Sequence, residues 1–338
     1  MVTSKCNLIE MNYIPPFSLT DEMMSLVANI AELVGHLSAT TEQLPAPHLR
    51  KENRIKTIQS SLAIENNSLT IEQVTAIIEG KRVLGAPNEI QEVKNAVDAY
   101  ELLLELNPYK EKDLLRAHRL MMAELVNENG RYRAGGVGIF NGSQCVHIGP
   151  PAHRVPLLMT DLLKWVSTTK THPLISSCVF HYEFEFIHPF ADGNGRMGRM
   201  WQTLLLMQWN PIFAWIPVET LVKEHQSEYY EAIAQSDREA SSTSFIVFML
   251  RCMLRTTQQM VESNPKSNPK SNPKSNPKSE QKVLDAMRVN PQVTVKELQE
   301  ITGLSESGVK KIIRHLRTAG TLERIGGNKG GYWKVISE

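Results

Sequence analysis

Residues 188–199 read His-Pro-Phe-Ala-Asp-Gly-Asn-Gly-Arg-Met-Gly-Arg, and an apolar stretch continues from them to Trp209. Because Gly195–Trp209 is apolar nearly all round, it predicts a helix buried in the middle of a helical bundle. Gly193 and Asn194 fall at the start of that helix. The first N–H groups of a helix have no partner within it, and with the helix dipole they form a site for an anion. Glycine there lets a phosphate approach the backbone closely.

The side chains of this twelve-residue stretch, which we call the motif, add to the anion site. Arg196 and Arg199 lie three residues apart on the predicted helix and offer two guanidinium forks to phosphate oxygens. Asp192 is suited to Mg²⁺, and a neutral His188 can take a proton from an attacking hydroxyl. Phe190 is expected to anchor the loop in the core. A helix cap with surface ion pairs is the alternative for the glycine-rich turn alone, but the whole set favours a phosphate-transfer site.

The motif is similar to the signature HxFx(D/E)GNGRxxR of the Fic family, and the resemblance extends over roughly residues 50–250. Members with this signature typically transfer AMP from ATP to a Ser, Thr or Tyr hydroxyl of a target protein. The resemblance implies that His188 is the general base and that Asp192 holds the Mg²⁺ that bridges the α- and β-phosphates. It also implies a set of nucleotide-binding residues: Gly193, Asn194, Gly195 and Arg196 at the α- and β-phosphates, Arg199 at the γ-phosphate, and Tyr230, the second of two paired tyrosines, near the nucleotide.

A second resemblance concerns Ser61 and Glu65, which share one face of a stretch expected to be helical from about Asn53. By itself the pair is typical of a surface Glu near a helix end closed by Asn66 or the residue after it. Upstream of the motif it resembles the (S/T)xxxE(G/N) inhibitory helix of the Fic family. In such relatives the Glu forms a salt bridge to the second arginine of the motif, here Arg199, and competes with the γ-phosphate. The resemblance implies a self-inhibited enzyme that modifies a target and itself.

Residues 135–151 contain five glycines and two short apolar stretches around Asn141-Gly142. Asn-Gly suits a type I′ turn, so a β-hairpin is predicted. The hairpin resembles the flap of the Fic family, which holds an extended segment of the target protein by strand addition. A purely structural hairpin is the alternative.

The fold is expected to be mainly α, a Fic-type helical bundle over residues 1–262 with the hairpin flap inserted. Further helices are predicted from apolar spacing over Leu19–Leu37, Val93–Leu106, Asp113–Val126 and Pro156–Val166. The family resemblance implies one more helix, Cys178–Ile187, directly before the motif. Residues 263–279 repeat Ser-Asn-Pro-Lys four times, which indicates an extended, solvated linker. A basic arm that binds nucleic acid is the alternative for this linker.

Residues 280–338, which we call the tail, resemble a small winged helix-turn-helix domain. The expected elements are helices over Glu280–Arg288, Thr294–Thr302 and Ser305–Ala319, with Thr294 and Ser305 as caps and Gly303 at the turn, and wing strands over Thr321–Ile325 and Tyr332–Ile336. Basic residues on the third helix and the wing could meet DNA: Lys310, Lys311, Arg314, His315, Arg317 and Lys329. The tail carries a net charge of only +3 and residues 1–262 carry −6, so protein docking or dimerisation stays an alternative.

The composition is that of an ordinary globular protein, with 338 residues, 41% hydrophobic and 22% charged. No apolar run is long enough for a membrane helix and no secretory signal is visible, so no membrane partner and a cytoplasmic location are expected. The four scattered cysteines indicate neither a disulfide framework nor a zinc site. Three alternatives to AMP transfer remain: removal of AMP, transfer of another phosphate-containing group, and a nucleotide-sensing DNA-binding regulator. Whether the chain forms a homo-oligomer is left open.

Overall fold

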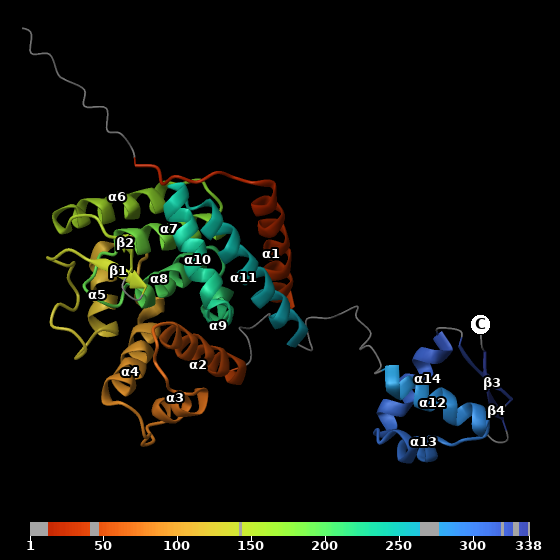
Figure 1. Cartoon of the computed structure of the whole chain (residues 1–338). Coiled ribbons are helices and arrows are strands. Elements are labelled where there is room, and N and C mark those ends of the chain that lie inside the picture. The colour runs from red at the N-terminus through yellow and green to blue at the C-terminus, as the bar shows by residue number, and fades with distance from the viewer. Residues whose placement is uncertain are drawn as a thin grey trace, which may run out of the picture. The chain divides into compact units, whose positions relative to one another are not determined.

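The computed structural model describes residues 13–40, 47–141, 144–263, 277–318, 321–326 and 331–336. The chain forms two compact units, Met1–Ser267 and Asn268–Glu338. The first is a helical bundle with one hairpin, and the second combines helices with a two-stranded sheet (Figure 1). In the described ranges no helix is long and apolar enough to cross a bilayer.

The mainly α fold expected for the first unit is observed. Its helices are α1 (Asp21–Thr40), α2 (Pro47–Ile64), α3 (Ile71–Ile78), α4 (Pro87–Glu101), α5 (Glu111–Met121), α6 (Val155–Thr168), α7 (Pro173–Ile187), α8 (Asn194–Trp209), α9 (Val218–Glu224), α10 (Gln226–Glu239) and α11 (Thr243–Ser263). Short 3₁₀ turns occupy Leu102–Glu105, Ala152–Arg154 and Pro211–Trp215. Strands β1 (Gly138–Asn141) and β2 (Gln144–Ile148) pair antiparallel with a bulge after Ile139. The rest of the turn predicted at Asn141-Gly142 lies outside the described residues.

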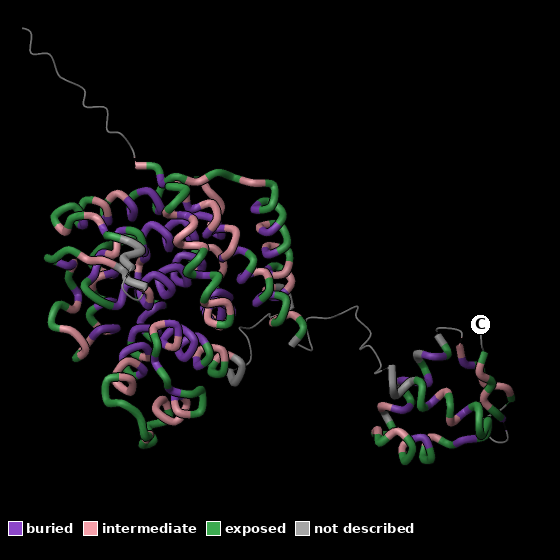
Figure 2. The backbone as a smooth tube through the Cα atoms, in the orientation of Figure 1, coloured by how far each residue is buried: buried purple, intermediate pink, exposed green. Residues whose placement is uncertain are grey.

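Helices α7 and α8 pack against each other in the middle of the first unit, where Figure 2 shows many buried residues. Trp201 of α8 and Phe180 and Phe184 of α7 are fully buried. Nearly every side chain of α8 from Asn194 to Leu206 is buried, which confirms the all-round burial predicted for this helix. The motif therefore starts the central helix, so the core holds it in place.

Several helix boundaries differ from those predicted. Helix α4 starts at Pro87, six residues before the predicted start, because Pro is favoured at the first helical position. Helix α5 ends at Met121 rather than Val126, and the chain turns through Glu124 at φ 61°. Helix α2 starts at Pro47, before Asn53, and α3, α9, α10 and α11 were not predicted.

The second unit contains α12 (Pro277–Val289), α13 (Val295–Thr302), α14 (Glu306–Thr318), β3 (Leu322–Ile325) and β4 (Tyr332–Val335), in the order expected for a winged helix. Thr294 caps α13 in a capping box with Glu297. Gly303 adopts φ 71° between α13 and α14, a left-handed turn that suits glycine. Val309 and Leu316 of α14 are buried in a hydrophobic core made of residues of the second unit.

Candidate active site

His188 lies at the end of α7 in a left-handed backbone conformation, with φ 49° and ψ 62°. Its N–H donates to the Phe184 carbonyl at 2.9 Å. Imidazole Nδ1 lies 3.3 Å from the Glu185 carbonyl oxygen. A carbonyl only accepts hydrogen bonds, so this contact puts the proton on Nδ1 and leaves the lone pair of the neutral ring on Nε2. A ring in this tautomer can accept a proton at Nε2.

The loop after His188 is fastened by two side chains. Phe190 is fully buried, as predicted, and stacks on His118 of α5 with ring centroids 3.6 Å apart. Asn194 accepts the Phe190 N–H at 2.8 Å and donates to the Phe190 carbonyl at 2.9 Å. The Asn194 side-chain amide therefore binds the loop itself.

His118, which was not predicted, holds the middle of the motif. Its Nε2 donates to the Asp192 carbonyl at 3.0 Å, and its Nδ1 accepts the Gly130 N–H at 2.8 Å. Burial lowers the pKa of His118 to about 4. The ring is therefore neutral at pH 7, as one donor and one acceptor nitrogen require.

Two of the three motif glycines, Gly193 and Gly195, lie where an added Cβ would clash with a neighbouring side chain. Gly193 precedes α8 at φ 83°, and a Cβ there would lie 2.5 Å from Met122 Sδ. A Cβ on Gly195 would lie 2.2 Å from Glu65 Oε1. Helix α8 begins with no side-chain cap, so no capping side chain accepts from the N–H groups of its first turn. The Glu65 carboxylate already lies against that turn.

Arg199 is buried and is held by the end of α2. Its Nη2 donates to Glu65 Oε1 at 2.7 Å and to the Ser61 carbonyl at 3.0 Å, and its Nε donates to Ser61 Oγ at 3.1 Å. Burial opposes the charged form of Arg199, but attraction to Glu65 and then Tyr229 outweighs it and raises the pKa of Arg199. The predicted contact between Glu65 and Arg199 is thus present. Asn66 follows at φ 69°, the left-handed cap considered for this helix.

Arg196 is also buried and also paired. Its Nη1 lies 3.2 Å from Glu92 Oε1 of α4, and its Nη2 lies 3.4 Å from Asp192 Oδ1. The second oxygen of Glu92 accepts from Asn67 Nδ2 at 2.7 Å. One carboxylate therefore links the first arginine of the motif to the segment that follows α2. The sequence offered no signal for Glu92, which lies 104 residues from Arg196.

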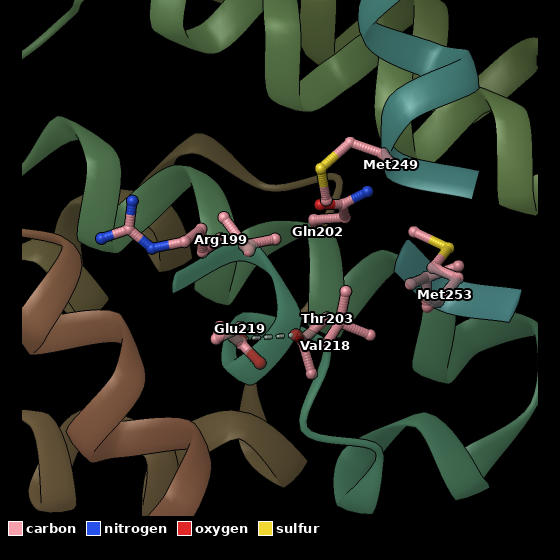
Figure 3. Close-up of a pocket in the computed structure, with 9 residues that line it drawn as sticks. Arg199, Gln202, Thr203, Val218, Glu219, Met249 and Met253 are labelled. Atoms are coloured by element: carbon pink, nitrogen blue, oxygen red, sulfur yellow. Dashed lines mark hydrogen bonds between the residues drawn. The ribbon is translucent and has the colours of Figure 1, made fainter. Parts of the chain in front are cut away.

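Another carboxylate, that of the buried Glu219, lines a small cavity together with Arg199 (Figure 3). Glu219 Oε1 accepts from Tyr100 Oη at 3.3 Å and from Thr203 Oγ1 at 3.4 Å, while Oε2 is buried without a hydrogen-bond partner. Burial raises the pKa of Glu219 to about 7, against the opposing pull of Arg199. The adjoining cavity of about 10 Å³ has room for one water molecule. It is lined by Arg199, Gln202, Thr203, Leu206, Val218, Glu219, Val222, Met249 and Met253.

Helix α10 contacts the end of α2 through Tyr230, a residue that is 48% exposed. Tyr230 Oη lies 3.4 Å from the Ile64 carbonyl oxygen, which also accepts from Gln226 at 2.8 Å. Tyr229, the first of the pair, is buried with its hydroxyl 3.1 Å from His181 Nε2. Tyr230 is therefore the accessible tyrosine of the two, and it borders the Glu65 region.

Asp192 fits the role of a magnesium ligand in its exposure and chemistry. Its side chain is 59% exposed and is the one carboxylate within the motif. Among the described residues no three His, Cys, Asp or Glu side chains gather as a metal cluster. A single carboxylate together with phosphate oxygens and water is an ordinary environment for Mg²⁺.

The comparisons with known proteins agree with this geometry. Residues 108–206 match the Fic/DOC family, and residues 277–323 match the winged helix-turn-helix DNA-binding family. A Fic family protein from Desulfovibrio desulfuricans G20, known from a crystal structure, is 44% identical with a TM-score of 0.72. The alignment covers 96% of this chain and 99% of that protein. This chain belongs to the Fic family.

Curated relatives of this Fic chain include two called "Protein adenylyltransferase Fic". The protein from Culex quinquefasciatus is 30% identical over 217 residues, which are 61% of this chain and 41% of that protein. The protein from Aedes aegypti is 27% identical over 230 residues, which are 65% and 44% of the two chains. This Fic chain therefore spans less than half the length of these two relatives.

The tail exposes part of the basic face that was predicted. Lys310, Arg314 and Arg317 of α14 are exposed, and Lys310 pairs with Glu306 at 2.6 Å. The side chains of Lys311 and His315, and all of Lys329, lie outside the described residues. The exposed cations lie opposite the buried face of α14, as binding in a DNA groove needs.

Proposed function

We propose that this Fic chain transfers AMP from ATP to a hydroxyl group of a target protein and of itself. One observation carries the proposal: the motif joins a histidine base, an exposed carboxylate, an open helix start and two buried arginines within twelve residues. Relatives called adenylyltransferases support it. The target hydroxyl gives its proton to His188 Nε2, and its oxygen bonds to the α-phosphorus. The bond from that phosphorus to the β-phosphate oxygen breaks, and pyrophosphate leaves.

The side chains divide this work among them. The start of α8 and Arg196 hold the α- and β-phosphates, and Arg199 holds the γ-phosphate, because guanidinium forks match phosphate oxygens. Asp192 would hold Mg²⁺, which when bound would supply positive charge to the phosphates. Tyr230 borders the nucleoside. The flap, residues 135–151, holds the target segment by strand addition.

We also propose that the resting site is self-inhibited by α2. Glu65 Oε1 forms an ion pair with Arg199 Nη2 at 2.7 Å and lies against Gly195. The carboxylate therefore takes the place proposed for the γ-phosphate. Ser61 adds two contacts to the same guanidinium. A hydrogen bond between charged groups contributes about 1.5–3 kcal/mol, enough to lower occupancy of the reactive pose about tenfold or more.

The test uses the Glu65→Gly chain, because self-inhibition would mask the activity of the parent. The protein is incubated with Mg-ATP labelled at the α-phosphate or at the γ-phosphate, with and without a cell lysate. We expect label from the α position alone to enter protein, and mass spectrometry to find an added AMP on a Ser, Thr or Tyr. Glu65→Gly combined with His188→Ala is the matched control and should incorporate none.

The same experiment separates the alternatives. Label from the γ position in protein would show transfer of phosphate instead. Loss of AMP from a previously modified target, faster with the parent than with the Glu65→Gly chain, would show that removal dominates. Absence of both would leave a nucleotide-sensing regulator.

DNA is the second partner that we propose, through the tail. The match to a DNA-binding winged-helix family and the exposed cations of α14 support it. Binding of fluorescent duplex DNA, measured at several salt concentrations, tests it. A DNA-binding tail should lose affinity steeply as salt rises, and Lys310→Ala with Arg317→Ala should reduce that dependence.

A further inference from the structure

Arg133 lies between α5 and the flap and is only 4% exposed. Its guanidinium donates to four backbone carbonyls. Nε donates to the His188 carbonyl at 2.7 Å, and Nη2 donates to the Ile187 carbonyl at 3.2 Å. Nη1 donates to Gly135 at 2.8 Å, and Nη2 also donates to Pro150 at 2.6 Å.

The first two of these carbonyls belong to the end of α7. The last carbonyls of a helix lack partners within it, and a cation there also complements the helix dipole. The backbone N–H of Arg133 adds a third bond to this turn, to the Pro189 carbonyl at 2.9 Å. His188 is left-handed, a conformation that a non-glycine residue keeps only where its surroundings hold it. Arg133 supplies much of that support.

The other two carbonyls belong to the two ends of the flap. Gly135 precedes β1 and Pro150 follows β2, so a single guanidinium spans the base of the hairpin. The flap closes there through the Gly149 N–H, which donates to the Val137 carbonyl at 3.1 Å. The fit is close, because a Cβ on Gly149 would lie 3.0 Å from Arg133 Nη2.

We propose that Arg133 is a positioning residue that sets the flap in register with His188. The inference rests on the proposed function, in which the flap carries the target hydroxyl and His188 takes its proton. Reaction requires that the attacking oxygen and the base meet within hydrogen-bond distance. Arg133 fixes that distance, because the same planar group bonds both parts. Its guanidinium bonds only to backbone carbonyls among the described residues, so we assign it no contact with the nucleotide or the target hydroxyl.

Lysine cannot replace arginine in this arrangement. A guanidinium has five N–H donors in one rigid plane, whereas an ammonium is a point with three donors. Arg133→Lys keeps the charge and loses the simultaneous bonds to α7 and the flap. Arg133→Gln loses the charge as well. Arg131, two residues earlier and exposed, provides the matched control as Arg131→Lys.

Hydrogen exchange measured on the full chain tests the linkage without any activity. In Arg133→Lys, peptides covering 133–150 and 186–192 should both exchange faster than in the parent, while peptides from α1 stay unchanged. Arg131→Lys should match the parent throughout. Faster exchange in only one of the two segments, or in neither, would overturn the linkage. Because this readout needs no ATP, it stands even if AMP transfer fails.

Kinetics of AMP transfer test the consequence, in the Glu65→Gly background. Misplacing reacting groups by about an ångström lowers a rate about a hundredfold. We expect Arg133→Lys to lower kcat for a protein target about ten- to a hundredfold and to change the dissociation constant of Mg-ATP less than about twofold. Arg133→Gln should lower kcat further. Equal losses in ATP affinity and kcat, or an unchanged kcat, would reject the positioning role.

Discussion

Two sets of cationic side chains in this molecule meet opposite surroundings. Arg196 and Arg199 in the first unit are 4% and 3% exposed, and each is paired with a carboxylate from the N-terminal helices. Lys310 and Arg317 of α14 are exposed to solvent. Both sets are proposed to meet phosphate. The buried set has lost its water on folding, so it needs a counter-charge whenever no phosphate is bound.

This contrast in burial predicts different phosphate binding by the two units. A buried arginine with a fixed carboxylate partner binds one anion in one pose, and any competitor for that arginine acts as a regulator. An exposed lysine makes weak contacts that salt screens, so affinity comes from the sum of several such contacts. The first unit is therefore suited to chemistry under internal control, and the second to association that follows ionic strength.

The largest expected effect separates chemistry from phosphate binding in the first unit. In the Glu65→Gly background, His188→Ala should lower AMP transfer by about 10²–10⁴, the usual loss for a general base. Binding of Mg-ATP, measured by calorimetry, should change less than about twofold, because His188 is not proposed to touch phosphate. AMP transfer at the Glu65→Gly rate would refute the assignment.

The next effect tests whether the counter-charge of Arg199 regulates. The Glu65→Gly chain should transfer AMP about tenfold or more faster than the parent, because the substitution removes a charged hydrogen bond of about 1.5–3 kcal/mol. The readout is labelled AMP per enzyme at matched Mg-ATP. Arg199→Ala is the control and should not copy the rise, because it removes the γ-phosphate contact too. Equal incorporation by parent and Glu65→Gly would leave Glu65 without an inhibitory role.

A third effect tests what a buried charge costs in stability. The pKa of Glu219 rises from 4.5 to about 7 on folding, so the folded chain binds more protons than the unfolded chain between these values. Its contribution to stability is therefore complete below about pH 4.5 and is lost as the pH rises through 7. Glu219→Gln should remove that loss.

The measurement is the free energy of unfolding of parent and Glu219→Gln at pH 5 and pH 8. We expect the parent to lose about 2–3 kcal/mol more than the variant across this interval. Parallel pH profiles would show that Arg199 keeps Glu219 ionised at both values.

A smaller effect distinguishes the two buried arginines from each other. Glu92 lies 3.2 Å from Arg196, farther than Glu65 lies from Arg199, and its side chain is 21% exposed. Glu92→Gln should raise AMP transfer about two- to fivefold, the range of a pair worth up to about 1 kcal/mol. The gain should add to that of Glu65→Gly, because different arginines are released. A tenfold loss would mean that Glu92 orients Arg196 for phosphate.

The smallest effect concerns the independence of the two units. Removing residues 264–338 from the Glu65→Gly chain should change AMP transfer less than about twofold, since a polar Pro-rich linker offers no core. DNA binding should be lost in the same protein. A lower or broader unfolding transition of the first unit would contradict this separation.

The sequence predicted the parts of the site that lie close together along the chain. The motif places the proposed base, the proposed metal ligand and the proposed phosphate-binding turn within twelve residues. Thr294 and Gly303 have the local chemistry that marks a helix cap and a turn. The pair between Glu65 and Arg199, 134 residues apart, was reached through the family resemblance. Long-range partners without a local pattern were missed.

Arg133, Glu92 and His118 are examples of such partners. Each contacts the motif or its neighbours from a different segment, and each bond depends on how helices pack rather than on spacing. A buried charge has no signature in a sequence of ordinary composition, because exposed lysines, arginines and acids are far more common. In the sequence, Glu219 likewise resembles any other glutamate of a helix. Only the fold shows that it accepts hydrogen bonds from Tyr100 and Thr203.

Gly195 constrains both the contact with the Glu65 carboxylate and the proposed binding of phosphate, so a change at this position would alter the two together. A Cβ at this position would lie 2.2 Å from the Glu65 carboxylate, and the same face of the backbone is where a phosphate is proposed to lie. A substitution that pushes the Glu65 carboxylate away would therefore also obstruct the phosphate proposed to bind there. In a genetic selection for unrestrained variants, substitutions should accumulate at Glu65 and Ser61, while position 195 stays glycine.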